Sequence, residues 1–243
     1  MPCQACIGFH WRCAARTTSS TRRCPANGID RVNACTAVKI CGLRTAADAR
    51  AAADAGASMV GLVFITGSPR CINRDEADGI LRALPNDVEP VALLADPDDG
   101  DPVLAWWRGR VQLHGNESEE TCQRIAARGF AVMKGFAYTP EDLQRWNACN
   151  AIDTLVVDGP RGGGGVPFDH AALAAQMPGL SKRVLLAGGL TPENVHAAIT
   201  AVHPWGVDVS SGVELQRGVK DAQLIAHFCR AAGVTPRRVP PIG

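Results

Sequence analysis

Six polar side chains stand at or just after the ends of short apolar segments, and their types suit proton transfer on a small anionic molecule. They are Cys41, Arg70, Gln112, His114, Lys134 and Asp158. A thiol and a carboxyl group can each take or give a proton when their surroundings tune the pKa, and a guanidinium pairs well with a carboxylate. Residue types alone also allow a Cys41–His114 nucleophilic pair or a Schiff base on Lys134. The set therefore indicates an enzyme site and leaves these chemistries open.

Two glycine-bearing corners late in the chain have the composition of a phosphate site. The first is LAGGL at 186–190, followed by TPEN, and the second is VDVSSGVE at 207–214. Each is typical of a buried strand that ends in a tight turn and then opens a helix, and helix N-termini offer unpaired N–H donors to anions. One such corner could be an ordinary turn. Two in succession favour phosphate binding by Gly188, Gly189, Ser210, Ser211 and Gly212.

The elements that must position these groups alternate regularly from residue 37 onward. Strands are expected at 38–41, 58–64, 90–94, 111–114, 131–134, 154–157, 184–187 and 206–209, each followed by a helix, the last running from about Lys220 to Ala231. This alternation fits an α/β protein, either a (β/α)8 barrel or a doubly wound sheet. Eight units and two late phosphate corners favour a single-domain TIM barrel, which places phosphate after strands seven and eight. No G-x-G-x-x-G motif follows the first strand, which weakens the alternative.

Composition and charge exclude several classes of protein. The 243 residues are 46% hydrophobic and 20% charged, with a formal net charge of +1. This balance does not favour nucleic acid or an anionic membrane surface as a partner, and no apolar run approaches the roughly 18 residues of a membrane span. We therefore expect a soluble domain that acts on a small molecule. The sequence does not distinguish a monomer from a homodimer.

Residues 1–36 differ from the rest of the chain. Five of the ten cysteines lie there, with several arginines, a run of hydroxyl residues and no acid before Asp30. This composition fits a disordered extension, a mis-assigned start or an organelle transit peptide. A metal site on Cys3, Cys6, His10 and Cys13 is disfavoured, because no second closely spaced Cys/His pair follows. The wide spacing of the other five cysteines fits a reducing cytoplasm. We expect a catalytic domain at 37–233 and a tail at 234–243.

Seven short motifs follow one another along the chain: VKICG at 38–42, SPR at 68–70, VQLHG at 111–115, VDG with a glycine-rich loop at 157–165, FD at 168–169, LAGGLxPENV at 186–195 and VDVSSGVE at 207–214. In their order and spacing they resemble phosphoribosylanthranilate isomerase of tryptophan biosynthesis. The resemblance covers about residues 37–232. It implies a (β/α)8 fold, no cofactor and no metal.

The resemblance also implies an Amadori rearrangement. The substrate would be N-(5-phosphoribosyl)anthranilate and the product 1-(2-carboxyphenylamino)-1-deoxyribulose 5-phosphate. Such a reaction needs an acid that protonates the ring oxygen and a base that removes the C2′ proton. By resemblance, Asp158 is the acid, Cys41 the base and Arg70 the partner of the anthranilate carboxylate. Further substrate contacts are expected from Gln112, His114, Gly163 and Gly164, with the roles of the first two left open.

Lys39 could support the proposed base. It precedes Cys41 by two residues, so both side chains point to the same side of the strand. A nearby cation stabilises a thiolate, and we predict this role for Lys39.

Two other functions compete with this interpretation. One is the sister isomerase of histidine biosynthesis, which resembles a duplicated half-barrel with two catalytic aspartates. It is disfavoured because strand one ends in Cys41 and the first half has no copy of the late phosphate corners. The other is a phosphosugar-binding module without activity, which the presence of both Cys41 and Asp158 disfavours.

Overall fold

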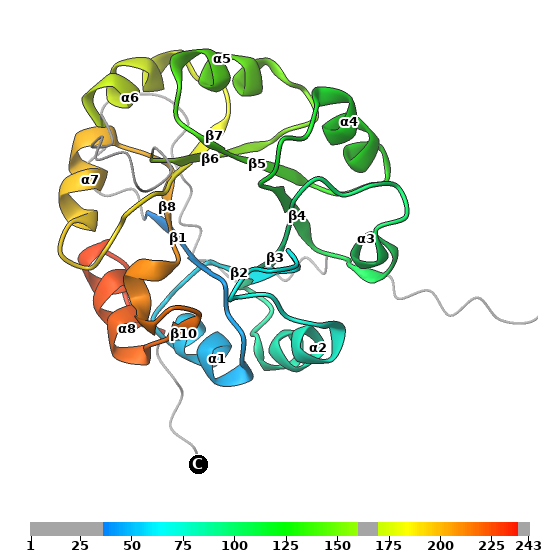
Figure 1. Cartoon of the computed structure of the whole chain (residues 1–243). Helices are drawn as coiled ribbons and strands as arrows, with labels where there is room; N and C mark the ends of the chain where they lie inside the picture. Colours follow the sequence, from blue (N-terminus) through cyan, green and yellow to red (C-terminus); the bar gives the residue numbers. More distant parts are fainter. Residues whose placement is uncertain (1–35, 160–169, 238–243) are drawn as a thin grey trace, which may run out of the picture. The chain divides into compact units, whose positions relative to one another are not determined.

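A computed structural model describes residues 36–159 and 170–237, which form a closed barrel of eight parallel strands ringed by helices (Figure 1). The strand order follows the chain, and the eighth strand pairs with the first to close the ring. This confirms the predicted (β/α)8 barrel over the doubly wound sheet, which is open. In the described segments no helix is long and apolar enough to cross a membrane. The predicted extension lies outside the described residues except for Thr36, so the domain boundaries stay a prediction.

The eight predicted strands all overlap observed ones. The strands are β1 (Ala37–Cys41), β2 (Met59–Val63), β3 (Glu89–Leu94), β4 (Arg110–Leu113), β5 (Val132–Ala137), β6 (Thr154–Asp158), β7 (Arg183–Leu186) and β8 (Gly206–Val209). The helices are α1 (Ala46–Asp54), α2 (Arg74–Ala83), α3 (Pro102–Trp106), α4 (Glu119–Ala127), α5 (Pro140–Ala148), α6 (His170–Gln176), α7 (Val195–Val202) and α8 (Ala222–Ala231). The fifth strand is longer than predicted, because it continues past Lys134 to Ala137.

Short polar residues determine where several helices begin. Thr45 and Asn73 form capping boxes with Asp48 and Glu76 at the starts of α1 and α2. In a capping box two orphan backbone N–H groups of the first turn are satisfied reciprocally. Side chains of Ser118, Thr139 and Asp221 likewise accept backbone N–H bonds at the starts of α4, α5 and α8. These caps set the residue at which each of these five helices begins.

The core has two layers, because strands of a parallel sheet are buried on both faces. The larger layer lies between the barrel and its helices and includes Ile40 and Leu62. The smaller layer fills the barrel interior with Cys41, Met59, Val63, Val91, Leu93, Met133, Val156, Leu185 and Ala187. Successive residues of a strand point to opposite faces, so Ile40 serves the outer layer and Cys41 the inner one. The thiol of Cys41 therefore belongs to the packed interior.

A two-stranded hairpin after the barrel was not predicted. Its strands, β9 (Glu214–Gln216) and β10 (Val219–Lys220), follow a 3-10 helix at Ser211–Val213. Gly218 turns the hairpin with φ +84°, and a Cβ there would lie 2.6 Å from the carbonyl oxygen of Pro69. The helix expected from about Lys220 begins at Ala222 instead. As a result, Lys220 belongs to a strand that lies beside the site.

Candidate active site

A cavity of about 290 Å³ opens at the carboxyl ends of the barrel strands. Nine of the predicted site residues line it: Cys41, Arg70, Gln112, His114, Asp158, Gly188, Gly189, Ser210 and Ser211. This is the end of the barrel where (β/α)8 enzymes carry their active sites. Gly212 does not line the cavity, and Gly163 and Gly164 lie outside the described residues.

Cys41 ends β1 and is only 6% exposed. The neighbouring strand leaves room for its thiol through a glycine, since a Cβ on Gly61 would lie 2.8 Å from Cys41 Sγ. Burial raises the pKa of the Cys41 thiol above its ordinary value; the charge of Lys39 opposes this rise, whereas that of Asp208 adds to it. The pKa of a base at this position therefore depends on neighbouring charges such as those of Lys39 and Asp208.

Lys39 is fully buried beside Cys41 and pairs with a carboxylate of β8. Its Nζ donates to Asp208 Oδ1 at 2.9 Å. Burial lowers the pKa of Lys39, but the charges of Asp208 and Cys41 outweigh it and raise the pKa overall. Lys39 thus remains an ammonium group next to the thiol, as its predicted role requires. The Asp208 carboxylate pairs with this ammonium group. The sequence did not predict this ion pair.

Asp158 ends β6 across the cavity, and its side chain is 36% exposed. Oδ2 lies 3.9 Å from Nε2 of His114, whose Nδ1 is 3.2 Å from Nε2 of Gln112. With Gln112 Nε2 as the donor to Nδ1, a neutral His114 carries its proton on Nε2, facing Asp158. Gly188 makes room for the acid, because a Cβ there would lie 2.5 Å from Asp158 Oδ1.

The two glycine-bearing corners meet in space, as a shared phosphate site requires. A Cβ on Gly212 would lie 1.9 Å from the carbonyl oxygen of Leu190, so only glycine allows the second corner to approach the first. Gly188 and Gly189 adopt φ values of +84° and +65°, the left-handed region that glycine enters without a Cβ penalty. Ser210 is tied to the first strand by a hydrogen bond from its Oγ to the carbonyl of Cys41 at 3.1 Å.

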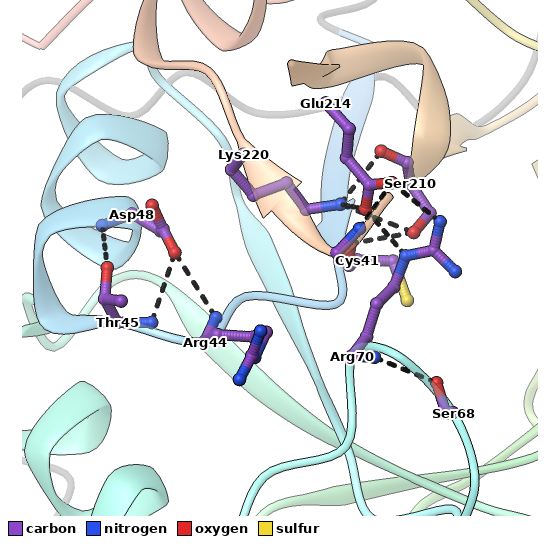
Figure 2. A network of polar contacts seen from close by, with 10 residues as sticks. Cys41, Arg44, Thr45, Asp48, Ser68, Arg70, Ser210, Glu214 and Lys220 are labelled. Carbon is purple, nitrogen blue, oxygen red and sulfur yellow. Dashed lines mark hydrogen bonds and ion pairs between the residues drawn. The ribbon is translucent and has the colours of Figure 1, made fainter. Parts of the chain in front are cut away.

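Arg70 reaches the cavity from the turn after β2 and forms an ion pair with Glu214 (Figure 2). Lys220 donates to the same carboxylate from β10 at 2.8 Å. Burial favours a protonated Glu214, but the hydrogen bonds from Arg70 and Lys220 prevail and lower the pKa of Glu214 to about 2. Burial in turn lowers the pKa of Lys220, although Glu214 opposes this. The rim of the cavity thus carries an ionised network.

Lys134 does not line the cavity. It lies within β5, opposite in direction to the inward-facing Met133, and its Nζ donates to Glu117 Oε2 at 2.6 Å and to the carbonyl of Gly115 at 2.9 Å. It therefore lies outside the site and fastens the turn after β4. As for metals, residues 36–159 and 170–237 bring no three His, Cys, Asp or Glu side chains into a metal-binding group; the cluster around Cys3 falls outside these ranges.

Three charged residues of the site were missed by sequence reasoning: Asp208, Glu214 and Lys220. Asp208 had a readable signal, because a carboxylate within the buried strand β8, two residues before Ser210, must face the same side. Glu214 ends the motif at 207–214, but its partners Arg70 and Lys220 are not indicated by neighbouring residues. Lys220 had no signal, since its reach toward Ser210 depends on the unpredicted hairpin.

Comparison with known proteins identifies the family of the chain. Residues 38–231 match the family described as N-(5'phosphoribosyl)anthranilate (PRA) isomerase. The chain belongs to this family. An N-(5'-phosphoribosyl)anthranilate isomerase of Paracoccus denitrificans (strain Pd 1222) is 43% identical over 208 residues, which cover 80% of this chain and 96% of the relative. That of Thiobacillus denitrificans is 41% identical over 203 residues, with 80% and 97% covered.

Solved structures of the same family share the fold. The phosphoribosyl anthranilate isomerase of Thermotoga maritima aligns with a TM-score of 0.74 at 35% identity, covering 82% of this chain and 98% of that one. A phosphoribosyl anthranilate isomerase in complex with reduced 1-(o-carboxyphenylamino)-1-deoxyribulose 5-phosphate aligns with a TM-score of 0.72 at 34% identity, with the same coverage.

Proposed function

We propose that this chain catalyses the Amadori rearrangement of N-(5-phosphoribosyl)anthranilate to 1-(2-carboxyphenylamino)-1-deoxyribulose 5-phosphate, an isomerase step of L-tryptophan biosynthesis. One observation carries the proposal: Cys41 and Asp158 line the same cavity, from strands on different sides of the barrel, in a chain of this family. The reaction needs one acid and one base, and these two groups can fill both roles without a cofactor.

Asp158 is proposed as the acid that opens the sugar ring. Its carboxyl group donates a proton to the ring oxygen, the bond from that oxygen to C1′ breaks, and the nitrogen lone pair forms an iminium. Oδ2 of the carboxylate that remains lies 3.9 Å from Nε2 of His114. We propose that His114 stabilises this charge, and that Gln112 keeps the imidazole in the required tautomer.

Cys41 is proposed as the base that moves the double bond. Its thiolate takes the proton from C2′, and the released electron pair neutralises the iminium to give an enolamine. The enolamine then gains a proton at C1′ and loses the hydroxyl proton at C2′, which yields the ketone of the product. Lys39 stabilises the thiolate in this account.

The remaining residues bind the substrate. The corners at Gly188, Gly189, Ser210, Ser211 and Gly212 are proposed to hold the phosphate through backbone N–H groups. Arg70 is proposed to pair with the anthranilate carboxylate. Within the described chain, Gln112 Oε1 is buried and accepts no hydrogen bond, so it is proposed to accept one from a substrate hydroxyl.

Assembly and location are proposed more broadly. A phosphoribosylanthranilate isomerase of Thermotoga maritima is dimeric, and we propose that this chain is a monomer or a homodimer in the cytoplasm. The phosphoribosyl substrate is its proposed partner, with neither nucleic acid nor membrane involved.

The test of the activity is a fluorescence assay of phosphoribosylanthranilate consumption, with the product identified by NMR. The expected product has the mass of the substrate and a ketone carbon at C2′. Tight binding of the substrate without turnover would overturn the isomerase and favour the binding module.

A further inference from the structure

Glu214 holds the guanidinium of Arg70 along one edge. Arg70 Nε donates to Oε1 at 2.6 Å and Nη2 donates to Oε2 at 2.8 Å, as Figure 2 shows. A bidentate pair of this kind fixes both the plane and the direction of a guanidinium. The Glu214 side chain is only 3% exposed, so little solvent screens the pair. Arg70 is therefore held in one orientation before any ligand binds.

The bidentate pair leaves the other edge of Arg70 open. A guanidinium has five N–H donors, and Glu214 uses one on Nε and one on Nη2. No hydrogen bond from Nη1 is found within the described part of the chain, although Arg70 lines the cavity. The free edge, which combines Nη1 with the second Nη2 proton, matches the spacing of a second carboxylate.

The same carboxylate is tied to the phosphate corner and to the strand of the proposed base. Lys220 Nζ bridges Glu214 Oε1 and the carbonyl oxygen of Ser210, each at 2.8 Å. Ser210 Oγ in turn donates to the carbonyl of Cys41 at 3.1 Å. A fourth donor, the backbone N–H of Gly218, reaches Glu214 Oε2 at 3.1 Å. The position of Arg70 is thus coupled through Glu214 and Lys220 to the other two parts of the site.

We propose that Glu214 is a positioning residue, which orients Arg70 so that the free edge of its guanidinium receives the carboxylate of the substrate. Glu214 acts through Arg70 and does not touch the substrate. This inference rests on the proposed function, because it deepens the recognition of the anthranilate ring. Binding is strengthened because the orientation of Arg70 is set in advance and its side chain loses less freedom when the ligand arrives.

The experiment compares two ligands on two proteins by calorimetry. The ligands are the product and its analogue without the carboxylate, 1-(phenylamino)-1-deoxyribulose 5-phosphate. Glu214→Gln keeps the size of the side chain but places an amide N–H2 against a guanidinium donor, so the bidentate pair is lost. We expect Glu214→Gln to weaken product binding about tenfold and to change the affinity of the analogue less than about twofold. In turnover, measured for each protein on the plateau of its own pH–rate profile, KM should rise about tenfold while kcat is nearly kept.

Two controls separate positioning from general damage. Glu214→Gln leaves Lys220 buried without its carboxylate, so the double variant Glu214→Gln/Lys220→Met restores the charge balance and should show the same loss of carboxylate preference. Asp48→Asn removes a carboxylate that caps α1 nearby and should leave the preference unchanged. Thermal unfolding of each variant checks that the fold is intact.

Equal losses of affinity for the two ligands would overturn the proposal. A Glu214 that only stabilises the fold would affect both ligands alike, whether or not they carry a carboxylate. Tighter product binding by Glu214→Gln would also overturn it, because Glu214 would then compete with the substrate for Arg70. The proposed function fails in a different way, namely if the wild-type protein neither binds the product nor turns over the substrate.

Discussion

The two proposed proton-transfer groups lie in opposite surroundings. Cys41 is 6% exposed, and its neighbouring cations Lys39 and Lys220 are each paired with a carboxylate. The Asp158 side chain is 36% exposed, and its Oδ2 lies 3.9 Å from Nε2 of His114. The base thus lies among balanced buried charges, whereas the acid has a partly exposed side chain.

This contrast shows where single charges matter. Buried charges interact strongly because little water screens them, while exposed ones are screened by solvent and salt. A changed charge beside Cys41 should therefore move the pKa of its thiol. A changed charge beside Asp158 should have a smaller effect on turnover. Cys41 and Asp158 have one feature in common. A glycine on a neighbouring segment, Gly61 or Gly188 respectively, leaves space for the side chain.

Removal of the proposed acid should lower kcat more than a change in the surroundings of either proton-transfer group. Asp158→Asn keeps the shape of the side chain but has no proton to donate to the ring oxygen, so kcat should fall by about 10²–10⁴-fold. Product affinity, measured by calorimetry, should change little. A variant that retains more than a tenth of wild-type kcat would remove Asp158 from the acid role.

A methyl group at the base end should disturb the position of the thiol. The Cβ of Gly61→Ala would lie 2.8 Å from Cys41 Sγ and 3.1 Å from Leu93 Cδ1. We expect kcat to fall about 10–100-fold, and the free energy of unfolding to fall by about 1–3 kcal/mol. Gly79→Ala is the matched control, because it adds the same methyl in α2 with no atom within 4 Å. Unchanged kcat in Gly61→Ala would show that the position of Cys41 is not critical.

The buried charges at the base end should control the pH dependence. Asp208→Asn removes a negative charge that raises the pKa of Cys41 and leaves the charge of Lys39 unopposed; Lys220 and Arg70, the other cations near the thiol, keep their partner Glu214. The pKa of Cys41 should fall, so the rise of kcat/KM with pH should move to lower pH by about one unit. The measurement is the pH–rate profile of wild type, Asp208→Asn and the surface control Asp48→Asn. A shift to higher pH would contradict this account of the base.

The rim network should contribute to stability in a pH-dependent way. Glu214 has a pKa of about 2 in the folded protein and about 4.3 when unfolded, so the unfolded state binds the proton first as pH falls. Its contribution of about 3 kcal/mol is present above pH 5 and is lost as pH falls toward 2. Denaturant unfolding of wild type and Glu214→Gln across this range should show a weaker pH dependence in the variant. Parallel curves would mean that Arg70 and Lys220 do not lower the pKa of Glu214 in the folded protein.

The sequence predicts the barrel well because the barrel depends on local pattern. Short apolar runs, caps such as Thr45 and the positions of the strand ends all follow from neighbouring residues. The same regularity explains why Cys41, Asp158 and the two corners could be assigned to one end of the barrel before the structure was known. The apolar pattern does not define where a strand ends. Lys134 was expected at the end of the fifth strand, but β5 continues to Ala137, and Lys134 points away from the cavity toward Glu117.

The charged partners could not be predicted, because they depend on contacts between distant segments. Arg70 and Glu214 are 144 residues apart, and Lys39 and Asp208 are 169 apart. The hairpin that carries Lys220 has strands of three and two residues, too short for a periodic signal. Such pairs emerge only when the ring closes and brings β8 against β1.

The central claim is that Cys41 removes the C2′ proton. Its most direct test is the single-turnover rate of wild type and Cys41→Ala on substrate that carries hydrogen or deuterium at C2′. We predict that deuterium slows the wild-type protein, because the C–H bond breaks in the catalysed step, and that Cys41→Ala is at least about 10³-fold slower. A wild-type rate in Cys41→Ala would contradict the account, because another group would then be the base.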